Sequence, residues 1–220
     1  MNKITKLNIF MGLFFILASY SYAYDDGDFQ IWNTDIEEFK MGKDSKIVLE
    51  EEFRWGDNAH EFYYHHYDGG FSYNFKKWLN GGMGYRHIYE LKKGKFMVEN
   101  EPYLTAKLLW DWEDFSLENR HRIEYRHFNY QKDSVRYRNK LTVRLPWGIR
   151  KAQPYFSEEI FISFYKLNDN ELNQNRFSLG LNMELTKRIK LETYYMLQSN
   201  KNSGKWIDAN VLGLNLKTVF

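Results

Sequence analysis

Hydrophobic and polar residues alternate with a period of two along most of this chain. The pattern is plainest in residues 211–220, where Leu212, Leu214, Leu216 and Phe220 share one face of an extended segment. A period of two is typical of a β-strand whose two faces meet different surroundings. The same alternation predicts eleven segments, over residues 29–39, 46–55, 62–75, 79–91, 101–110, 115–128, 135–145, 155–165, 176–185, 189–198 and 211–220. The chain is therefore predicted to be all-β.

The connections between these segments alternate in length, which predicts a barrel. Short connections fall at residues 76–78, 111–114, 146–153 and 186–188, and longer polar ones near 56–61, 91–100, 129–134, 166–174 and 199–205. Short turns at one end and longer loops at the other are typical of an outer-membrane barrel. No Pro- or Gly-rich linker divides the chain, so residues 24–220 are predicted to form a single antiparallel up-and-down transmembrane β-barrel.

The number of strands is left open by the sequence. Bacterial single-chain barrels have an even number of strands, whereas eleven segments alternate here. Either residues 29–39 do not span the wall, or a strand has been merged or missed. The prediction is therefore about 10–12 strands.

The first residues predict export. Lys3 and Lys6 precede an apolar run over residues 7–18, and small residues surround a cleavage point after Ala23. This is the pattern of a signal peptide over residues 1–23, and the apolar run is too short for a transmembrane helix.

Removing residues 1–23 takes away two lysines and no acidic residues, which leaves 29 basic and 29 acidic residues. A neutral chain does not suggest a nucleic-acid partner, and the lack of cysteine excludes a disulfide framework or thiolate metal site.

The aromatic residues favour a membrane barrel over a soluble one. They make up 19% of a chain with many charged residues, which suits a wet lumen between two aromatic girdles. Tryptophans prefer membrane interfaces, and six of them fall beside the predicted connections: Trp55, Trp78, Trp110, Trp112, Trp147 and Trp206. A soluble exported β-barrel or sandwich that acts as a binding protein is the alternative, but it would bury most of its tryptophans mid-strand.

Two neighbouring segments carry charge at every second position. Residues 115–128 and 135–145 hold seven bases and two acids on one face each: Glu118, Arg120, Arg122, Glu124, Arg126, Arg136, Arg138, Lys140 and Arg144. A midplane Arg or Lys facing lipid costs about 2–4 kcal/mol, so these faces are expected to line the lumen. Compensating carboxylates are expected from Glu50, Glu52, Glu159, Glu184 and Glu192. The charges predict either an ion-pair ladder that fills a narrow barrel or a selectivity surface for small anionic solutes.

Two resemblances add to this interpretation. Residues 119–126 and 136–140 resemble a recurrent hairpin of the domain-of-unknown-function family 2490, and residues 154–161 and 173–176 resemble the segments that follow it. That resemblance implies an outer-membrane barrel and brings no catalytic roles. The terminal strand ending at Phe220 resembles the strand that the barrel-assembly machinery reads in outer-membrane proteins. Outer-membrane lipids and that machinery are therefore the expected partners.

The function predicted from the sequence is an integral outer-membrane barrel, either structural or a narrow channel with an Arg-rich lumen. The alternative is a lipid-modifying enzyme of the deacylase or lipase type, which needs a serine and a histidine within hydrogen-bond reach. His66 and Ser72 share a face but lie roughly 20 Å apart along a strand, and only a cross-strand pair is left open. His65 and His66 point to opposite faces, a poor metal signal. No catalytic, metal or cofactor site is predicted.

Overall fold

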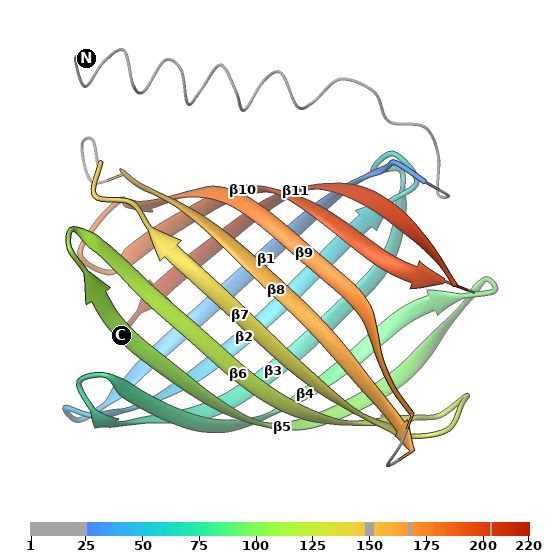
Figure 1. Cartoon of the computed structure of the whole chain (residues 1–220), viewed down its shortest axis with the longest axis horizontal. Helices are drawn as coiled ribbons and strands as arrows, with labels where there is room; N and C mark the ends of the chain where they lie inside the picture. The colour runs from blue at the N-terminus through green and yellow to red at the C-terminus, as the bar shows by residue number, and fades with distance from the viewer. Residues whose placement is uncertain (1–25, 148–151, 167–168, 203) are drawn as a thin grey trace.

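The structure, a computed structural model, describes residues 26–147, 152–166, 169–202 and 204–220. These residues form one closed barrel whose strands run obliquely across its wall (Figure 1). The signal peptide predicted over residues 1–23 lies outside the described residues. The strands are β1 (Asp28–Met41), β2 (Ser45–Gly56), β3 (Glu61–Lys76), β4 (Leu79–Lys92), β5 (Lys95–Trp112), β6 (Phe115–Phe128), β7 (Ser134–Arg144), β8 (Ala152–Lys166), β9 (Asp169–Glu184), β10 (Ile189–Asn202) and β11 (Lys205–Val219). Nowhere in the described residues is there a helix with the length and apolar character to cross a membrane.

The barrel closes through a parallel pair of strands. β1 lies beside β11 in the same direction, with Asp28 opposite Ala209 at one end and Glu38 opposite Val219 at the other. Every other neighbouring pair is antiparallel. An odd number of strands in up-and-down order gives the first and last strands one direction, so their pairing must be parallel. The expectation of a wholly antiparallel barrel is therefore wrong at this pair, and residues 29–39 do span the wall.

The carboxyl terminus is attached to β1. The backbone N–H of Phe220 donates to the carbonyl oxygen of Glu38 at 2.9 Å, and Lys40 N–H donates back to the Phe220 carbonyl oxygen at 3.3 Å. The Phe220 ring stacks on Phe39, with 4.9 Å between the ring centroids. Terminal residues usually fray unless something ties them down. Here the last residue extends the seam between the first and last strands.

The strands reach farther than the sequence predicted. Residues 91–100 were expected to form a loop, but β4 and β5 meet at a two-residue turn, Lys93-Gly94. Both residues have positive φ, 53° and 74°, as a type I′ hairpin turn requires. β10 and β11 likewise extend to Asn202 and Lys205 through most of the loop predicted near 199–205. The contrast between short turns and long loops is therefore weaker than expected.

At the end of the barrel where β1 begins, the connection between β6 and β7 is a loop, as predicted. Residues 129–133 join β6 to β7, and Asp133 anchors them by accepting hydrogen bonds from His127 Nδ1, Tyr125 Oη and the backbone N–H of Phe128. The hydrogen bond from His127, followed by that from Tyr125, lowers the pKa of Asp133 to about 2. This carboxylate therefore stays ionised and holds the loop over the whole neutral range.

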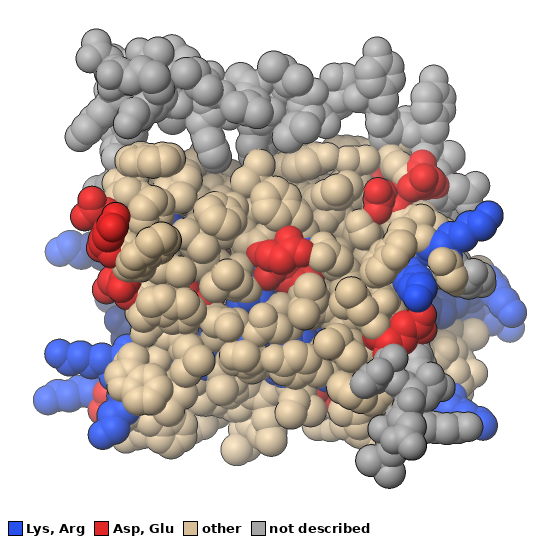
Figure 2. Space-filling model, in the orientation of Figure 1, with Lys and Arg blue, Asp and Glu red and all other residues tan. Residues whose placement is uncertain are grey.

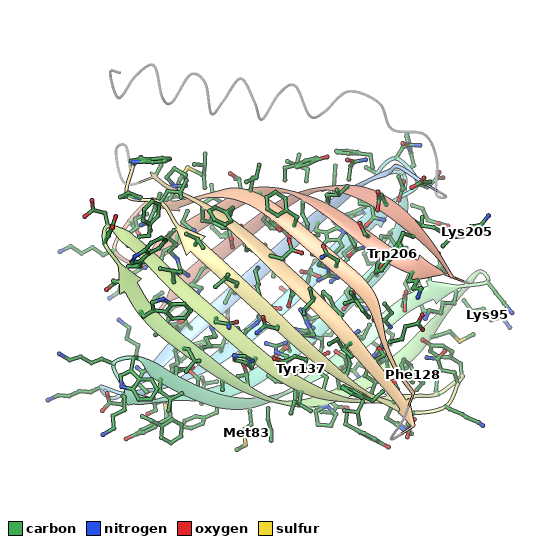
Figure 3. All side chains as sticks on the ribbon, viewed as in Figure 1. Met83, Lys95, Phe128, Tyr137, Lys205 and Trp206 are labelled. Atoms are coloured by element: carbon green, nitrogen blue, oxygen red, sulfur yellow. The ribbon has the colours of Figure 1, made fainter. Side chains whose placement is uncertain are left out.

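The outer wall of the barrel is mostly apolar. Figure 2 shows one side of it as largely uncharged, with charged residues gathered at the two ends and one acidic patch near the middle. Met83, which is 60% exposed, projects away from the wall in Figure 3. Exposed large hydrophobic residues occur around the circumference, among them Leu49, Tyr67, Phe71, Tyr85, Leu104, Ile123, Phe156, Phe177, Leu197, Leu212, Leu214 and Leu216.

The tryptophans divide between the two ends and the interior. Trp206 is exposed at the end where β11 begins (Figure 3), and Trp55 packs against Phe62 at the same end with 5.6 Å between ring centroids. Trp32 is only 2% exposed and faces the lumen. Four more are exposed at the end where the chain terminates: Trp78, Trp110, Trp112 and Trp147.

A small polar cluster interrupts the apolar wall on β6 and β7. The side-chain amide of Asn139 donates to Asn119 Oδ1 at 2.7 Å, and His121 Nδ1 lies 2.7 Å from the hydroxyl oxygen of Tyr137. Asn119 and His121 lie on the same face of β6 as Leu117 and Ile123. Hydrogen bonding among these four side chains reduces the cost of placing them in apolar surroundings.

Candidate functional site

Tyrosine rings lie over glycines on one side of the lumen. Tyr194 of β10 faces Gly213 of β11, and Tyr155 of β8 faces Gly180 of β9. A Cβ atom added to Gly213 would lie 1.9 Å from Tyr194 Cζ, so the ring needs a residue without a side chain beneath it. The two rings pack along the wall in a buried cluster with Trp32, Met196 and Val211. This packing keeps large aromatic side chains from filling the middle of the barrel.

Charged side chains line the neighbouring part of the lumen. Alternate residues of β6, β7 and β8 point inward, and the structure brings together inside the barrel all ten residues of the predicted charge ladder: Glu118, Arg120, Arg122, Glu124, Arg126, Arg136, Arg138, Lys140, Arg144 and Glu159. The register places Arg120 opposite Lys140 and Arg122 opposite Arg138. Like charges directly opposite one another are destabilising, so the neighbouring strands must supply the balancing carboxylates.

Glu124 is the most enclosed of these carboxylates. It is 0% exposed, and its oxygens accept hydrogen bonds from Arg136 Nε at 2.5 Å and Arg138 Nη1 at 2.8 Å. Arg122 Nη1 lies 3.7 Å away. Arginine can present several donors to carboxylates in a fixed geometry. Glu124 therefore joins β6 to β7 through two charge-assisted hydrogen bonds.

Glu159 joins the ladder to β8 and β9. It accepts hydrogen bonds from Arg120 Nη2 at 2.6 Å and from Arg138 Nη2 at 2.9 Å. Arg176 of β9, which the sequence analysis did not include, lies 3.9 Å from its other oxygen and also contacts Gln198. Arg138 thus lies between Glu124 and Glu159 and connects three strands.

Two further carboxylates, Glu99 and Glu101 of β5, were missed by the sequence analysis. Glu99 accepts hydrogen bonds from Arg126 Nε and Nη2, the latter at 2.9 Å. Glu101 accepts from Arg136 Nη2 at 2.6 Å and is 0% exposed. Glu99 fell within the predicted 91–100 loop, so its two-residue spacing from Glu101 was not interpreted as one face of a strand. The spacing of two residues between Glu99 and Glu101 was the sequence pattern that could have identified both as residues of one strand face.

The carboxylates expected from other strands have mixed roles. Glu52 pairs with Arg54 at 2.5 Å, and Glu50 lies 3.1 Å from His66 Nε2. Glu192 accepts a hydrogen bond from Asn215 at 2.7 Å. Glu184 does not enter the lumen: its side chain is 61% exposed and pairs with Lys190 at the turn between β9 and β10. The expectation for Glu184 is wrong because Glu184 is the last residue of β9, where water solvates its carboxylate.

Charged and aromatic side chains together enclose a cavity of about 550 Å³. Ten basic side chains and seven carboxylates belong to its lining, so positive charge exceeds negative charge around it. A dry apolar pocket would exclude a polar solute, whereas this lining can solvate one. The lumen is therefore partly filled by ion pairs and partly open to a small polar molecule.

The residues considered for catalysis are not brought together. No hydrogen bond within the described part of the chain joins a histidine to a serine; His66 instead contacts Tyr64 and Glu50. Across the same residues, no group of three His, Asp or Glu side chains is placed to hold a metal ion.

Comparison with known proteins gives one family match. A family model described as "Protein of unknown function (DUF2490)" matches residues 29–209, from β1 into β11. Neither the comparison with curated proteins nor that with solved structures found a match.

Proposed function

The chain belongs to the DUF2490 family of proteins of unknown function, and on that premise we propose that it is an integral outer-membrane β-barrel with a narrow, anion-preferring bore. The observation that carries this proposal is the distribution of its side chains. The wall is apolar on the outside, while Glu101 and Glu124, fully buried, lie inside. A soluble barrel would show the opposite arrangement, because it would place its apolar side chains away from water.

Strand length supports the membrane location. A transmembrane β-strand needs about 9–11 residues when it is tilted, and the strands here have between 11 and 18 residues. The exposed tryptophans at both ends, with Trp55, form the proposed aromatic girdle. Outer-membrane lipids would surround the wall between them.

The terminal strand supports assembly by the outer-membrane machinery. Leu212, Leu214 and Leu216 are 37–42% exposed on the outer wall, and Phe220 is 57% exposed beside Phe39. These side chains lie on the outer surface of the barrel, where the machinery could contact them. In this proposal the assembly machinery recognises β11, and β1 then pairs with β11 to close the barrel.

Deleting Phe220 tests the location and the assembly signal together. We expect the wild-type protein to stay with the membrane fraction after an alkaline wash and to migrate faster on gels when it is not heated. The deletion should reduce this folded, membrane-bound form severalfold, because the last backbone pairing with Glu38 and the stacking on Phe39 are lost. Deleting Lys132, in the 129–133 loop, is the control and should have little effect. Wild-type protein in the soluble periplasmic fraction would contradict the proposal.

The bore is proposed to be narrow because ion pairs occupy much of its cross-section. The single side chain of Arg138, on β7, bridges a carboxylate on β6 and a carboxylate on β8. Rings of basic side chains favour anions in pores, and the excess of basic groups around the cavity gives the same preference here. We therefore expect small single-channel currents with anion selectivity.

Replacing Arg138 by Glu tests the bore. The variant would place a third carboxylate beside Glu124 and Glu159, and we expect it either to prevent the barrel from folding or to reduce its anion preference in planar bilayers. Gel mobility of the unheated sample distinguishes these two results. The matched control is Arg188→Glu, which changes an exposed residue at the β9–β10 turn and should leave the currents unchanged. A wide, weakly selective pore that ignores Arg138→Glu would refute the proposed bore.

A further inference from the structure

Two of the described cations that line the cavity, Arg122 and Lys140, have neither a hydrogen bond to the protein nor a carboxylate oxygen within hydrogen-bond distance. Arg122 of β6 is 9% exposed, and its Nε and Nη1 atoms are buried and have no hydrogen-bond partner within the described residues. The nearest carboxylate oxygen, on Glu124, lies 3.7 Å from Nη1, beyond hydrogen-bond distance. Glu124 already binds Arg136 and Arg138. A buried guanidinium with unmet donors costs free energy, so its presence calls for an explanation.

Lys140 of β7 is the second such cation. Among the described residues, no carboxylate oxygen lies within 4.0 Å of its ammonium group; Glu159, directly opposite on β8, is already bound by Arg120 and Arg138. The register places Lys140 opposite Arg120 and Arg122 opposite Arg138, so Arg122 and Lys140 lie diagonally across the β6–β7 pair. Both side chains line the same cavity of about 550 Å³.

We propose that this cavity binds a small polar oxyanion, a phosphate or a dicarboxylate, which Arg122 and Lys140 hold together. This assignment deepens the proposed anion preference of the bore and rests on it. An oxyanion bound in the cavity would supply a counter-charge to both Arg122 and Lys140. Arginine matches carboxylate and phosphate oxygens with its planar fork, and lysine adds a compact point charge. Two cations in diagonal positions favour a ligand with more than one negative charge.

The surroundings of Arg122 hold it in place. Its guanidinium lies over the Tyr103 ring at 4.0 Å, and the Tyr103 hydroxyl donates to Asp68 Oδ1 at 2.7 Å. A stacked, fixed guanidinium loses little conformational freedom on binding. Arg54 and Arg176 cover the ring of Trp32 at 3.6 Å and 4.9 Å, so that part of the lining does not offer an apolar surface. The site therefore selects a hydrophilic anion rather than one with a large apolar body.

Titration calorimetry on the folded protein in detergent tests this assignment, with inorganic phosphate and succinate as the probes. We expect saturable binding of at least one of them, weakened at least tenfold in Arg122→Gln and in Lys140→Gln. The matched control is Arg144→Gln, an inward residue of β7 that pairs with Glu118 at 3.0 Å and does not line the cavity. It should bind the probes as the wild type does. The tighter of the two probes identifies whether phosphate or carboxylate chemistry is preferred.

A second measurement separates binding from a structural role. Since neither Arg122 nor Lys140 forms a hydrogen bond to a carboxylate, replacing either by Gln should leave the urea midpoint unchanged or raise it, whereas loss of a structural ion pair would lower it. Failure of both probes to bind folded wild-type protein, or binding by the two variants as tight as that by the wild type, would overturn the assignment. The assay uses detergent-solubilised protein, so its result does not depend on the fractionation that tests the outer-membrane location.

Discussion

Glu124→Gln is expected to lower the free energy of unfolding by about 3–5 kcal/mol, the usual cost of removing one partner from a buried ion pair. Glu124 is fully buried, and it accepts hydrogen bonds from Arg136 and Arg138 while Arg122 lies near it. The amide is nearly the same size as the carboxylate, so packing changes little. It nevertheless removes the negative charge and points N–H donors at guanidinium groups that are themselves donors. Urea titration, followed by the loss of the fast-migrating form on unheated gels, measures the change.

Glu184→Gln is the matched control for this prediction. Its side chain is 61% exposed at the β9–β10 turn and forms one ion pair, with Lys190 at 3.2 Å. Exposed ion pairs contribute about 0–1 kcal/mol, so its urea midpoint should stay close to that of the wild type. Equal midpoints for Glu124→Gln and the wild type would mean that Glu124 does not hold the network together.

The effect of Glu124 differs in sign from that expected at Arg122 and Lys140. Glu124 accepts hydrogen bonds from two guanidinium groups, whereas Arg122 and Lys140 have no carboxylate within hydrogen-bond distance among the described residues. Removing a shared carboxylate leaves buried positive charge, while removing an unpartnered cation relieves it. Replacing an acid and replacing a base in the lumen should therefore change stability in opposite directions.

The alternation of side chains predicted much of this fold. The two-residue period predicts that Arg120 and Arg122 share one face of β6 and that Arg138 lies on the charged face of β7, and those faces do meet inside a closed barrel. The family resemblance, based on residues of β6, β7, β8 and β9, is confirmed by the match over residues 29–209. Alternation is informative here because each strand separates two different surroundings along its whole length.

Alternation alone did not locate the strand ends or the counter-charges. Residues 91–100 are rich in lysine and were interpreted as a loop, although a hairpin needs only Lys93 and Gly94 to turn. A strand in a wet lumen can carry Glu99 and Glu101 near its end, where a soluble strand would usually be apolar. Which base each carboxylate joins depends on barrel register and curvature, which local periodicity does not specify. The same limit applies to Arg176, whose partners come from β8 and β10.

The parallel seam was missed for a different reason. Each segment was recognised, but the even number of strands usual in bacterial barrels made β1 the doubtful one. Nothing in the sequence of residues 29–39 specifies the direction of their neighbour on the other side. The closed barrel satisfies the backbone hydrogen bonds of both edges whether the last pair is parallel or antiparallel. Direction then follows from the number of strands alone.

A disulfide across this seam is expected to form nearly completely in the double variant Ile31→Cys with Leu212→Cys. The two residues are opposite one another in the parallel register, and both are exposed on the outer wall, at 38% and 41%. Adjacent strands lie about 4.7–4.9 Å apart, within the Cα separation that disulfides allow. The chain has no cysteine of its own, so any cross-link comes from the introduced pair. Mild oxidation of the folded barrel, then non-reducing electrophoresis after full denaturation, measures the cross-linked fraction.

Ile31→Cys with Leu216→Cys is the control, because it uses the same outer face of β11 at a position four residues farther along. At about 3.3 Å per residue the second cysteine lies roughly 13 Å from the first along the strand, so it should not cross-link in the folded barrel. Efficient cross-linking of this control, or none in the Leu212 pair, would show that β1 does not close the barrel in this register. In that case β11 would need another strand or a partner chain to satisfy its free edge, because an unpaired strand edge within lipid leaves several backbone groups without hydrogen bonds.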